Sequence, residues 1–166
     1  MLATKAVRQK YQASSDLLQL LDKFRCMVNI CVTIGIEQNI SSLKTLASRA
    51  HPCLSRDILG YYRLGAIGAA TGILRNYRKA KKKNPRTRLP YARKLMLNMW
   101  CGFKLQNYVL RLPVKPRKYV SVKLNGHTLQ VLSGLNVRSV TITLDSLSIS
   151  YSKETAEIVP EGIRCG

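Results

Sequence analysis

The chain has 166 residues and carries 28 Lys and Arg against 8 Asp and Glu, for a formal net charge of +20. Hydrophobic residues make up 46% of the sequence, which is enough for a folded core and excludes a chain too polar to fold. A domain this basic repels itself, and a polyanion relieves that repulsion while counterions are released. Composition therefore favours a nucleic acid as partner, with an anionic membrane surface as the second candidate.

The N-terminal half is expected to form one strand followed by helices. Residues 2–12 alternate as a strand does, and the apolar residues after Ser14, a candidate N-cap, recur at helical spacing. A short second helix is expected over residues 42–50. A long third helix is expected to begin at Ser55, a plausible cap, and to run to about residue 83.

The third predicted helix contains an unusual number of small residues. Gly65, Gly68, Ala69 and Gly72 leave part of its surface nearly smooth. Glycine costs about 1 kcal/mol relative to alanine inside a helix. Several of them together therefore suggest that another helix or backbone segment approaches this surface closely.

Residues 94–153 are expected to be strands. Residues 118–124 alternate between apolar and polar side chains, and Asn125-Gly126 is a strong signal for a two-residue hairpin turn. Residues 128–132 would be the return strand, and two more alternating runs follow. The expected fold class is α+β, a small antiparallel β-barrel interrupted by a helical insert of about three helices.

The charge is distributed unevenly along the chain. Residues 58–144, 87 in all, contain 18 Lys and Arg and no Asp or Glu. A surface that serves only solubility mixes both signs. The densest part, residues 75–94, holds ten bases, continues from the end of the long helix and then becomes extended at its two prolines. This stretch predicts a surface that binds a polyanion.

Two basic groups are the candidate contacts with nucleic acid, because Lys supplies point charges for phosphates and Arg supplies bidentate donors. The first basic group consists of Arg75, Arg78, Lys79, Lys81, Lys82, Lys83, Arg86, Arg88, Arg93 and Lys94. The second basic group consists of Lys104, Arg111, Lys115, Arg117, Lys118 and Lys123. Tyr77 and Tyr91 are interleaved with the first group and are candidates for stacking on unpaired bases, although most tyrosines are core or boundary residues.

The sequence shows no catalytic constellation, cofactor motif or metal site. It has only two histidines, His51 and His127, and its five cysteines include no C-x-x-C pair. A two-metal nuclease needs several converging carboxylates, which the central 87 residues lack. We therefore expect no enzyme activity, no cofactor, no metal, no small-molecule substrate and no membrane partner for this chain, and a reduced protein without a membrane span.

The order of the predicted parts resembles the N-terminal region of TnpB-family (OrfB-type) proteins of bacterial and archaeal insertion sequences. A short strand is followed by a helical insert, a basic linker and a β-unit that includes Arg-Lys-Tyr-Val-Ser-Val-Lys-Leu at 117–124. In that family a wedge-type β-barrel is split by a helical recognition domain, and a RuvC-like nuclease domain follows. The run 159–166, Val-Pro-Glu-Gly-Ile-Arg-Cys-Gly, stands where the first nuclease strand would start.

The resemblance implies a domain division and a set of partners. Residues 1–13 and 94–153 would form the wedge-like barrel, residues 14–93 the recognition domain with the basic linker, and residues 154–166 a tail leading to an absent nuclease domain. The partners would be a guide-type structured RNA and a double-stranded DNA target, in a prokaryotic cytoplasm and at the nucleoid when bound. No catalytic residue carries over, because the nuclease acids and zinc-ribbon cysteines of the family lie beyond residue 166.

Two other functions are consistent with the same residues. One is a stand-alone DNA-binding regulator or transposition accessory, because residues 45–50 and 55–58 have some likeness to a helix-turn-helix. The other is a structural protein associated with ribosomes or other RNA, which also tolerates high positive charge. An enzyme is the least favoured function, because Asp and Glu residues are so scarce in the sequence.

Overall fold

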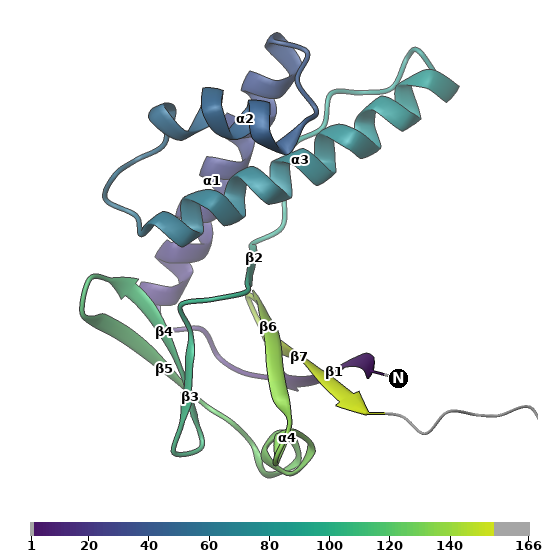
Figure 1. Cartoon of the computed structure of the whole chain (residues 1–166). Coiled ribbons are helices and arrows are strands. Elements are labelled where there is room, and N and C mark those ends of the chain that lie inside the picture. Colours follow the sequence, from purple (N-terminus) through teal and green to yellow (C-terminus); the bar gives the residue numbers. More distant parts are fainter. Residues whose placement is uncertain (1, 155–166) are drawn as a thin grey trace, which may run out of the picture.

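The computed structural model describes residues 2–154, and it is α+β with two antiparallel sheets (Figure 1). In chain order the elements are β1 (Leu2–Lys10), α1 (Ser15–Glu37), α2 (Leu43–Ala50), the 3₁₀ turn η1 (His51–Cys53), α3 (Gly60–Lys83), β2 (Met96–Met99), β3 (Lys104–Gln106), β4 (Val109–Lys115), β5 (Lys118–Lys123), α4 (Gly126–Leu132), β6 (Asn136–Thr143) and β7 (Ser146–Glu154). The tail expected over residues 154–166 lies, apart from Glu154, outside the residues that the structure describes.

The first strand of the chain pairs with the last described one. The four-stranded sheet has the order β1-β7-β6-β2, and β1 pairs antiparallel with β7 along its whole length, from Leu2 opposite Glu154 to Lys10 opposite Ser146. Helices α1 to α3 therefore form an insert between two strands of one sheet. Figure 1 shows these three helices above the strands, with β2 leading down from them into the sheet.

The expected β-barrel is not closed, and this prediction was wrong. The strands β3-β4-β5 form a second sheet, and the side chain of Gln9, only 6% exposed, joins β1 to the end of β5. Its Nε2 donates to the carbonyl of Lys123 at 3.0 Å, and its Oε1 accepts from the N–H of Asn125 at 3.0 Å. One side chain supplies two hydrogen bonds here, where a strand ladder would be needed to close a barrel.

The Asn125-Gly126 pair begins a helix rather than a hairpin, which corrects the expected return strand over residues 128–132. The side-chain oxygen of Asn125 accepts from the N–H of Thr128 at 2.8 Å, so that Asn125 is the N-cap of α4. Asparagine is favoured both in tight turns and at N-caps, because its short side chain bonds to nearby backbone N–H groups. The dipeptide alone could not decide between the two.

The helical insert agrees with most of its predicted boundaries. Ser14 caps α1 by accepting from the N–H of Leu17 at 3.3 Å, as expected. The long helix, however, begins at Gly60 and not at Ser55, whose hydroxyl only accepts from the N–H of Asp57 at 3.3 Å in a local turn. Leu54 and Ile58, in the connection before α3, are buried in the core. Their burial favours a non-helical path for this connection, so the helix starts after Ser55.

The small residues of α3 meet a neighbour at one end only. A Cβ at Gly65 would lie 3.5 Å from a ring carbon of Phe24 in α1, so the expected close approach is confirmed there. No atom lies within 4 Å of the positions that a Cβ would take at Gly68 or Gly72. For these two residues the expectation was wrong, because α3 turns that part of its surface to open space.

One buried tyrosine fastens the helices to the three-stranded sheet. Tyr62 of α3 is 1% exposed, and its hydroxyl donates to the carbonyl of Pro113 in β4 at 2.5 Å. Burial raises the pKa of this phenol far above its ordinary value, so it stays a neutral donor. The N-terminal end of α3 is thereby held against β4.

Replacing Gln9 by Ala should weaken the contact between the two sheets. The change removes both bonds that join β1 to the end of β5 and leaves partly buried backbone groups without partners. We expect the free energy of unfolding to fall by about 1–3 kcal/mol, measured by chemical denaturation. Exposed Gln12 changed to Ala is the matched control and should have little effect; equal losses in the two variants would contradict a joining role for Gln9.

Candidate nucleic-acid interface

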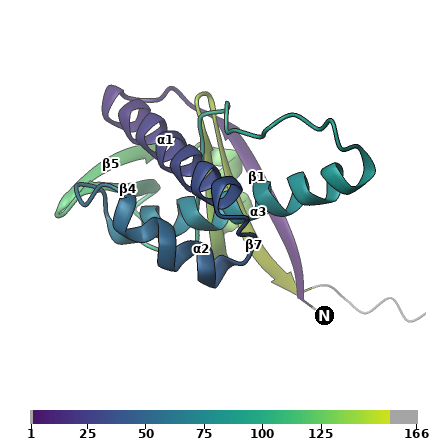
Figure 2. The same cartoon turned by 90° about the horizontal axis from the view of Figure 1, so that it is seen from above.

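The first basic group lies on the C-terminal part of α3 and on the linker of residues 84–95. The last turn of α3 carries Lys81, Lys82 and Lys83, where cations interact favourably with the helix dipole. Figures 1 and 2 both show this end of α3 extending away from the sheets, with the linker returning from it to β2. All ten basic side chains of the group are exposed.

Two arginines of the first basic group also hold the connection between α1 and α2. The Nη2 of Arg78 donates to the carbonyl and to the side-chain oxygen of Asn39, both at 2.7 Å, and the Nε of Arg75 donates to the carbonyl of Ser41 at 3.4 Å. Asn39 has a positive φ of 54°, so this turn needs support. A guanidinium has five N–H donors, and each arginine therefore keeps donors free for a ligand.

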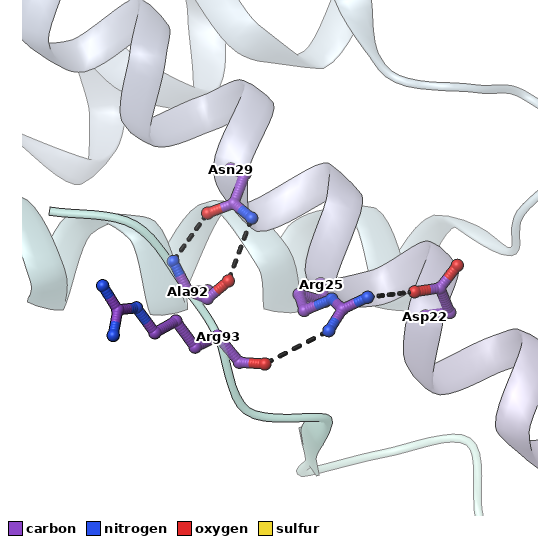
Figure 3. Close-up of polar contacts among 5 residues, drawn as sticks. All are labelled: Asp22, Arg25, Asn29, Ala92 and Arg93. Atoms are coloured by element: carbon purple, nitrogen blue, oxygen red, sulfur yellow. Dashed lines mark hydrogen bonds and ion pairs between the residues drawn. The ribbon is translucent and has the colours of Figure 1, made fainter.

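The linker is clamped to α1 by two neighbouring side chains (Figure 3). The amide of Asn29 donates to the carbonyl of Ala92 at 3.0 Å and accepts from the N–H of Ala92 at 2.6 Å. Arg25 donates to the carbonyl of Arg93 at 3.2 Å and to the carboxylate of Asp22 at 2.5 Å. A segment that the sequence predicts as extended and basic is thus fixed in place at its C-terminal part.

The clamp leaves the side chains of Tyr91 and Arg93 exposed. In Figure 3 the Arg93 guanidinium points away from Arg25, and it lies 4.7 Å from the ring centroid of Tyr91. Tyr91 is 57% exposed and therefore offers an accessible ring beside a cation. Tyr77 is half-buried, with Lys81 at 5.7 Å from its ring, and is less accessible for stacking.

The second basic group lies on the outer face of the three-stranded sheet and at its β4–β5 turn. Strand register places Lys104 opposite Arg111, and Arg111 opposite Ser121. Lys123 lies on the same face. The other three members, Lys115, Arg117 and Lys118, stand at the turn. The apolar partners Leu110, Leu112, Val120 and Val122 point to the opposite, covered face, as the alternation of residues 118–124 predicted.

Tyr119 belongs to this face and was missed by sequence reasoning. Lys104 lies 5.3 Å and Arg111 4.9 Å from its ring centroid, so one aromatic ring gathers two cations. Its place beside Ser121 and Lys123 on the polar face of the alternating run was the available signal. Nearby Tyr61 of α3 has a raised pKa, caused first by burial and then by Tyr119 and Cys101.

The structure does not bring the two basic groups together. α3 has 24 residues, and its first turns lie against β4 while its last turn carries the lysines of the first group. At about 1.5 Å per residue this helix is roughly 36 Å long. Figures 1 and 2 show the β4–β5 hairpin and the C-terminal end of α3 at opposite sides of the molecule. A single ligand that touches both groups would have to be extended.

Acidic partners for these cations are scarce. Among residues 2–154 the ion pairs are Asp22 with Arg25, and Asp16 with Lys118 at 3.9 Å. Only Lys118, therefore, of the two basic groups has an acid partner in the described chain. Among residues 2–154, therefore, no carboxylate would have to be displaced for a polyanion to approach the other bases.

The described residues show neither a metal cluster nor a membrane span. Between residues 2 and 154, no three His, Cys, Asp or Glu side chains are grouped so that they could hold a metal ion. Over the same range, every helix is too short or too polar to cross a bilayer.

Comparison with protein-family models gives no match for this sequence, and comparison with curated proteins gives none either.

Replacing Asn29 by Ala should release the linker. The N–H and carbonyl of Ala92 would lose their only side-chain partner, and we expect amide exchange at Ala92 to accelerate about tenfold, the equivalent of one ordinary hydrogen bond. Hydrogen exchange measured by NMR or mass spectrometry checks this. Exposed Gln19 of α1 changed to Ala is the control; unchanged exchange in the Asn29 variant would show that other contacts hold the linker.

Proposed function

We propose that this chain is a nucleic-acid-binding module that grips sugar–phosphate backbones and has no catalytic role of its own. The observation that carries the proposal is the set of exposed cations in the two basic groups, of which only Lys118 has an acid partner among residues 2–154. Phosphates that replace counterions at such cations gain affinity from the release of salt. The clamped linker adds to this gain, because part of its ordering cost is met before the ligand arrives.

The separation of the two basic groups favours an extended polymer over a small anion. Roughly 36 Å along α3 corresponds to about one turn of a nucleic-acid duplex. A nucleotide or a single phosphate would engage only one group. A duplex or a folded RNA can reach both, which fits the basic composition of the whole stretch 58–144.

We further propose that the chain is the binding half of a TnpB-like RNA-guided nuclease, with a guide-type structured RNA and a double-stranded DNA target as its partners. The connectivity supports this: β1 lies in one sheet with β6 and β7, and α1 to α3 are inserted between β1 and β2. A β-unit split by a helical insert is what the resemblance implies. In such systems base pairing reads the target sequence, while the protein binds backbone and shape.

The arrangement of α2 and α3 does not favour the helix-turn-helix alternative. Residues 51–59 separate the two helices and include the turn η1. A helix-turn-helix joins its helices through a turn of about three or four residues. The recognition-helix geometry expected for a small DNA-binding regulator is therefore not supported at this place.

Changing Lys79, Lys81, Lys82 and Lys83 together to Ala should weaken binding to every sequence and flatten its salt dependence. Each lost phosphate contact should reduce the slope of log affinity against log salt by about 0.7–0.9. Fluorescence anisotropy with a labelled duplex at several salt concentrations measures this slope.

The matched control removes four exposed cations outside the two basic groups, with Lys23, Lys44, Arg49 and Arg56 changed to Ala. Its net charge equals that of the test variant, so only the position of the cations differs. A control variant that flattens the slope as much as the test variant would show that net charge alone governs binding.

The RNA that co-purifies with the chain tests the finer proposal. We expect one structured RNA, derived from the end of a transposon, to be strongly enriched when the bound RNA is sequenced. Bulk ribosomal RNA in its place would overturn the RNA-guided assignment and would favour a ribosome-associated protein.

A further inference from the structure

The outer face of the four-stranded sheet is lined with hydroxyl groups that neither basic group includes. In the central strand β7, Ile149 and Tyr151 point into the core, and Ser148, Ser150 and Ser152 alternate with them on the other face. The register pairs Ser148 with Thr141 of β6 and Ser152 with Thr4 of β1, and Ser139 lies opposite Ser150. We define the hydroxyl face as Thr4, Ser139, Thr141, Ser148, Ser150 and Ser152.

The hydroxyl face consists of small side chains, with Arg8 of β1 opposite Ser148 in the same register and Arg138 of β6 reaching across β7 to Thr4. Its six side chains are half-buried or exposed, and none of them is larger than threonine. With strand residues about 3.4 Å apart and strands about 4.8 Å apart, it covers roughly 14 Å by 10 Å. Serine is a poor strand residue compared with valine, threonine or tyrosine. Three alternate serines in a central strand therefore suggest a requirement for low relief with hydrogen-bonding capacity.

Some of these hydroxyls are available to a ligand, and arginines stand beside them. Ser139 and Ser150 share a hydrogen bond of 2.6 Å, whereas the side chains of Ser148, Thr141 and Ser152 bond to no other described residue. Arg138 reaches the face through its bond to the hydroxyl of Thr4 at 3.1 Å. From β1, Arg8 donates to the hydroxyl of Ser146 at 3.2 Å, at one end of the same strand.

These features match the chemistry of an RNA double helix. Each serine hydroxyl can donate and accept, as can the ribose 2′-hydroxyl. The minor groove of A-form RNA is wide and shallow and displays rows of 2′-hydroxyls, whereas the minor groove of B-form DNA is narrow and lacks them. A face of small hydroxyls with the guanidinium groups of Arg8 and Arg138 beside them can contact the shallow RNA groove and reach the phosphates that border it.

We propose that the hydroxyl face docks against the minor groove of double-helical RNA and distinguishes RNA from DNA through 2′-hydroxyl contacts. This inference rests on the proposed nucleic-acid-binding function and names the form of nucleic acid that this surface takes. The basic groups supply affinity for both kinds of duplex, and the hydroxyl face supplies the preference between them.

The test uses the full chain with a 5′-labelled RNA duplex of about 16 base pairs, the span of a known shape-reading RNA-binding module, and a DNA duplex of the same sequence. In the double variant Ser148→Ala/Ser152→Ala the net charge and the strand shape are unchanged. We expect its affinity for the RNA duplex to fall about tenfold. Its affinity for the DNA duplex and its salt slope should stay as in the unmodified protein.

Exposed hydroxyls elsewhere provide the matched control, Thr45→Ala/Ser48→Ala on α2, which should bind both duplexes as the unmodified protein does. Circular dichroism and a denaturation curve establish that each variant is folded. Loss of RNA affinity in a folded Ser148→Ala/Ser152→Ala protein, with none in the control, supports the inference.

Four outcomes would overturn it, and they separate it from the proposed function. If the double variant binds RNA unchanged, or loses RNA and DNA affinity equally, the hydroxyl face does not read 2′-hydroxyls, although nucleic-acid binding stands. If the variant changes only self-association in sedimentation, a second copy covers the face. If the unmodified protein binds neither duplex, and the salt-slope experiment also shows no binding, the proposed function fails together with this inference.

Discussion

The antiparallel ladder between β1 and β7 is the constraint on which the rest of the structure depends. It joins residues 2–10 to residues 146–154. Closing so long a loop costs conformational entropy. The continuous ladder and the burial of the inner face of the sheet offset this cost. The ladder makes α1 to α3 an insert and sets the direction in which α1 leaves the sheet. Tyr11, directly after β1, extends the join by donating its hydroxyl to the carbonyl of Thr143 at 2.5 Å.

The linker of residues 84–95 is held in place despite repulsion between its own positive charges. Ten bases between residues 75 and 94 repel one another, and the bonds of Asn29 and Arg25 hold the C-terminal part of the linker on α1. A polyanion that binds here would relieve the repulsion and would meet a segment that is already ordered. In our proposal, the same amide and guanidinium contacts serve both stability and binding.

In our proposals, the surfaces contribute to recognition in two chemically different ways. Charged side chains on α3, the linker and the three-stranded sheet attract any phosphate backbone, and salt weakens them all. The six residues of the hydroxyl face are uncharged, with Arg8 and Arg138 beside them, and they offer directional donors and acceptors. In our proposals the first kind of surface gives affinity and the second gives preference for one form of nucleic acid.

Short-range patterns in the sequence determined much of this protein. The helical spacing of apolar residues, the Ser14 cap, the first strand and the alternation of residues 118–124 were all predicted correctly, because each depends on neighbours within a few positions. The position of most cations at the surface followed from their charge. Only the tertiary structure decided that Gln9 takes the place of a barrel ladder, because its two partners lie more than a hundred residues along the chain. The Asn125 cap itself is a local bond to Thr128, but the same dipeptide also fits a turn, and the bond from the N–H of Asn125 to Gln9 fixes this segment in the fold. The hydroxyl face likewise exists only once strands more than a hundred residues apart lie side by side, and no local pattern in the sequence records that pairing.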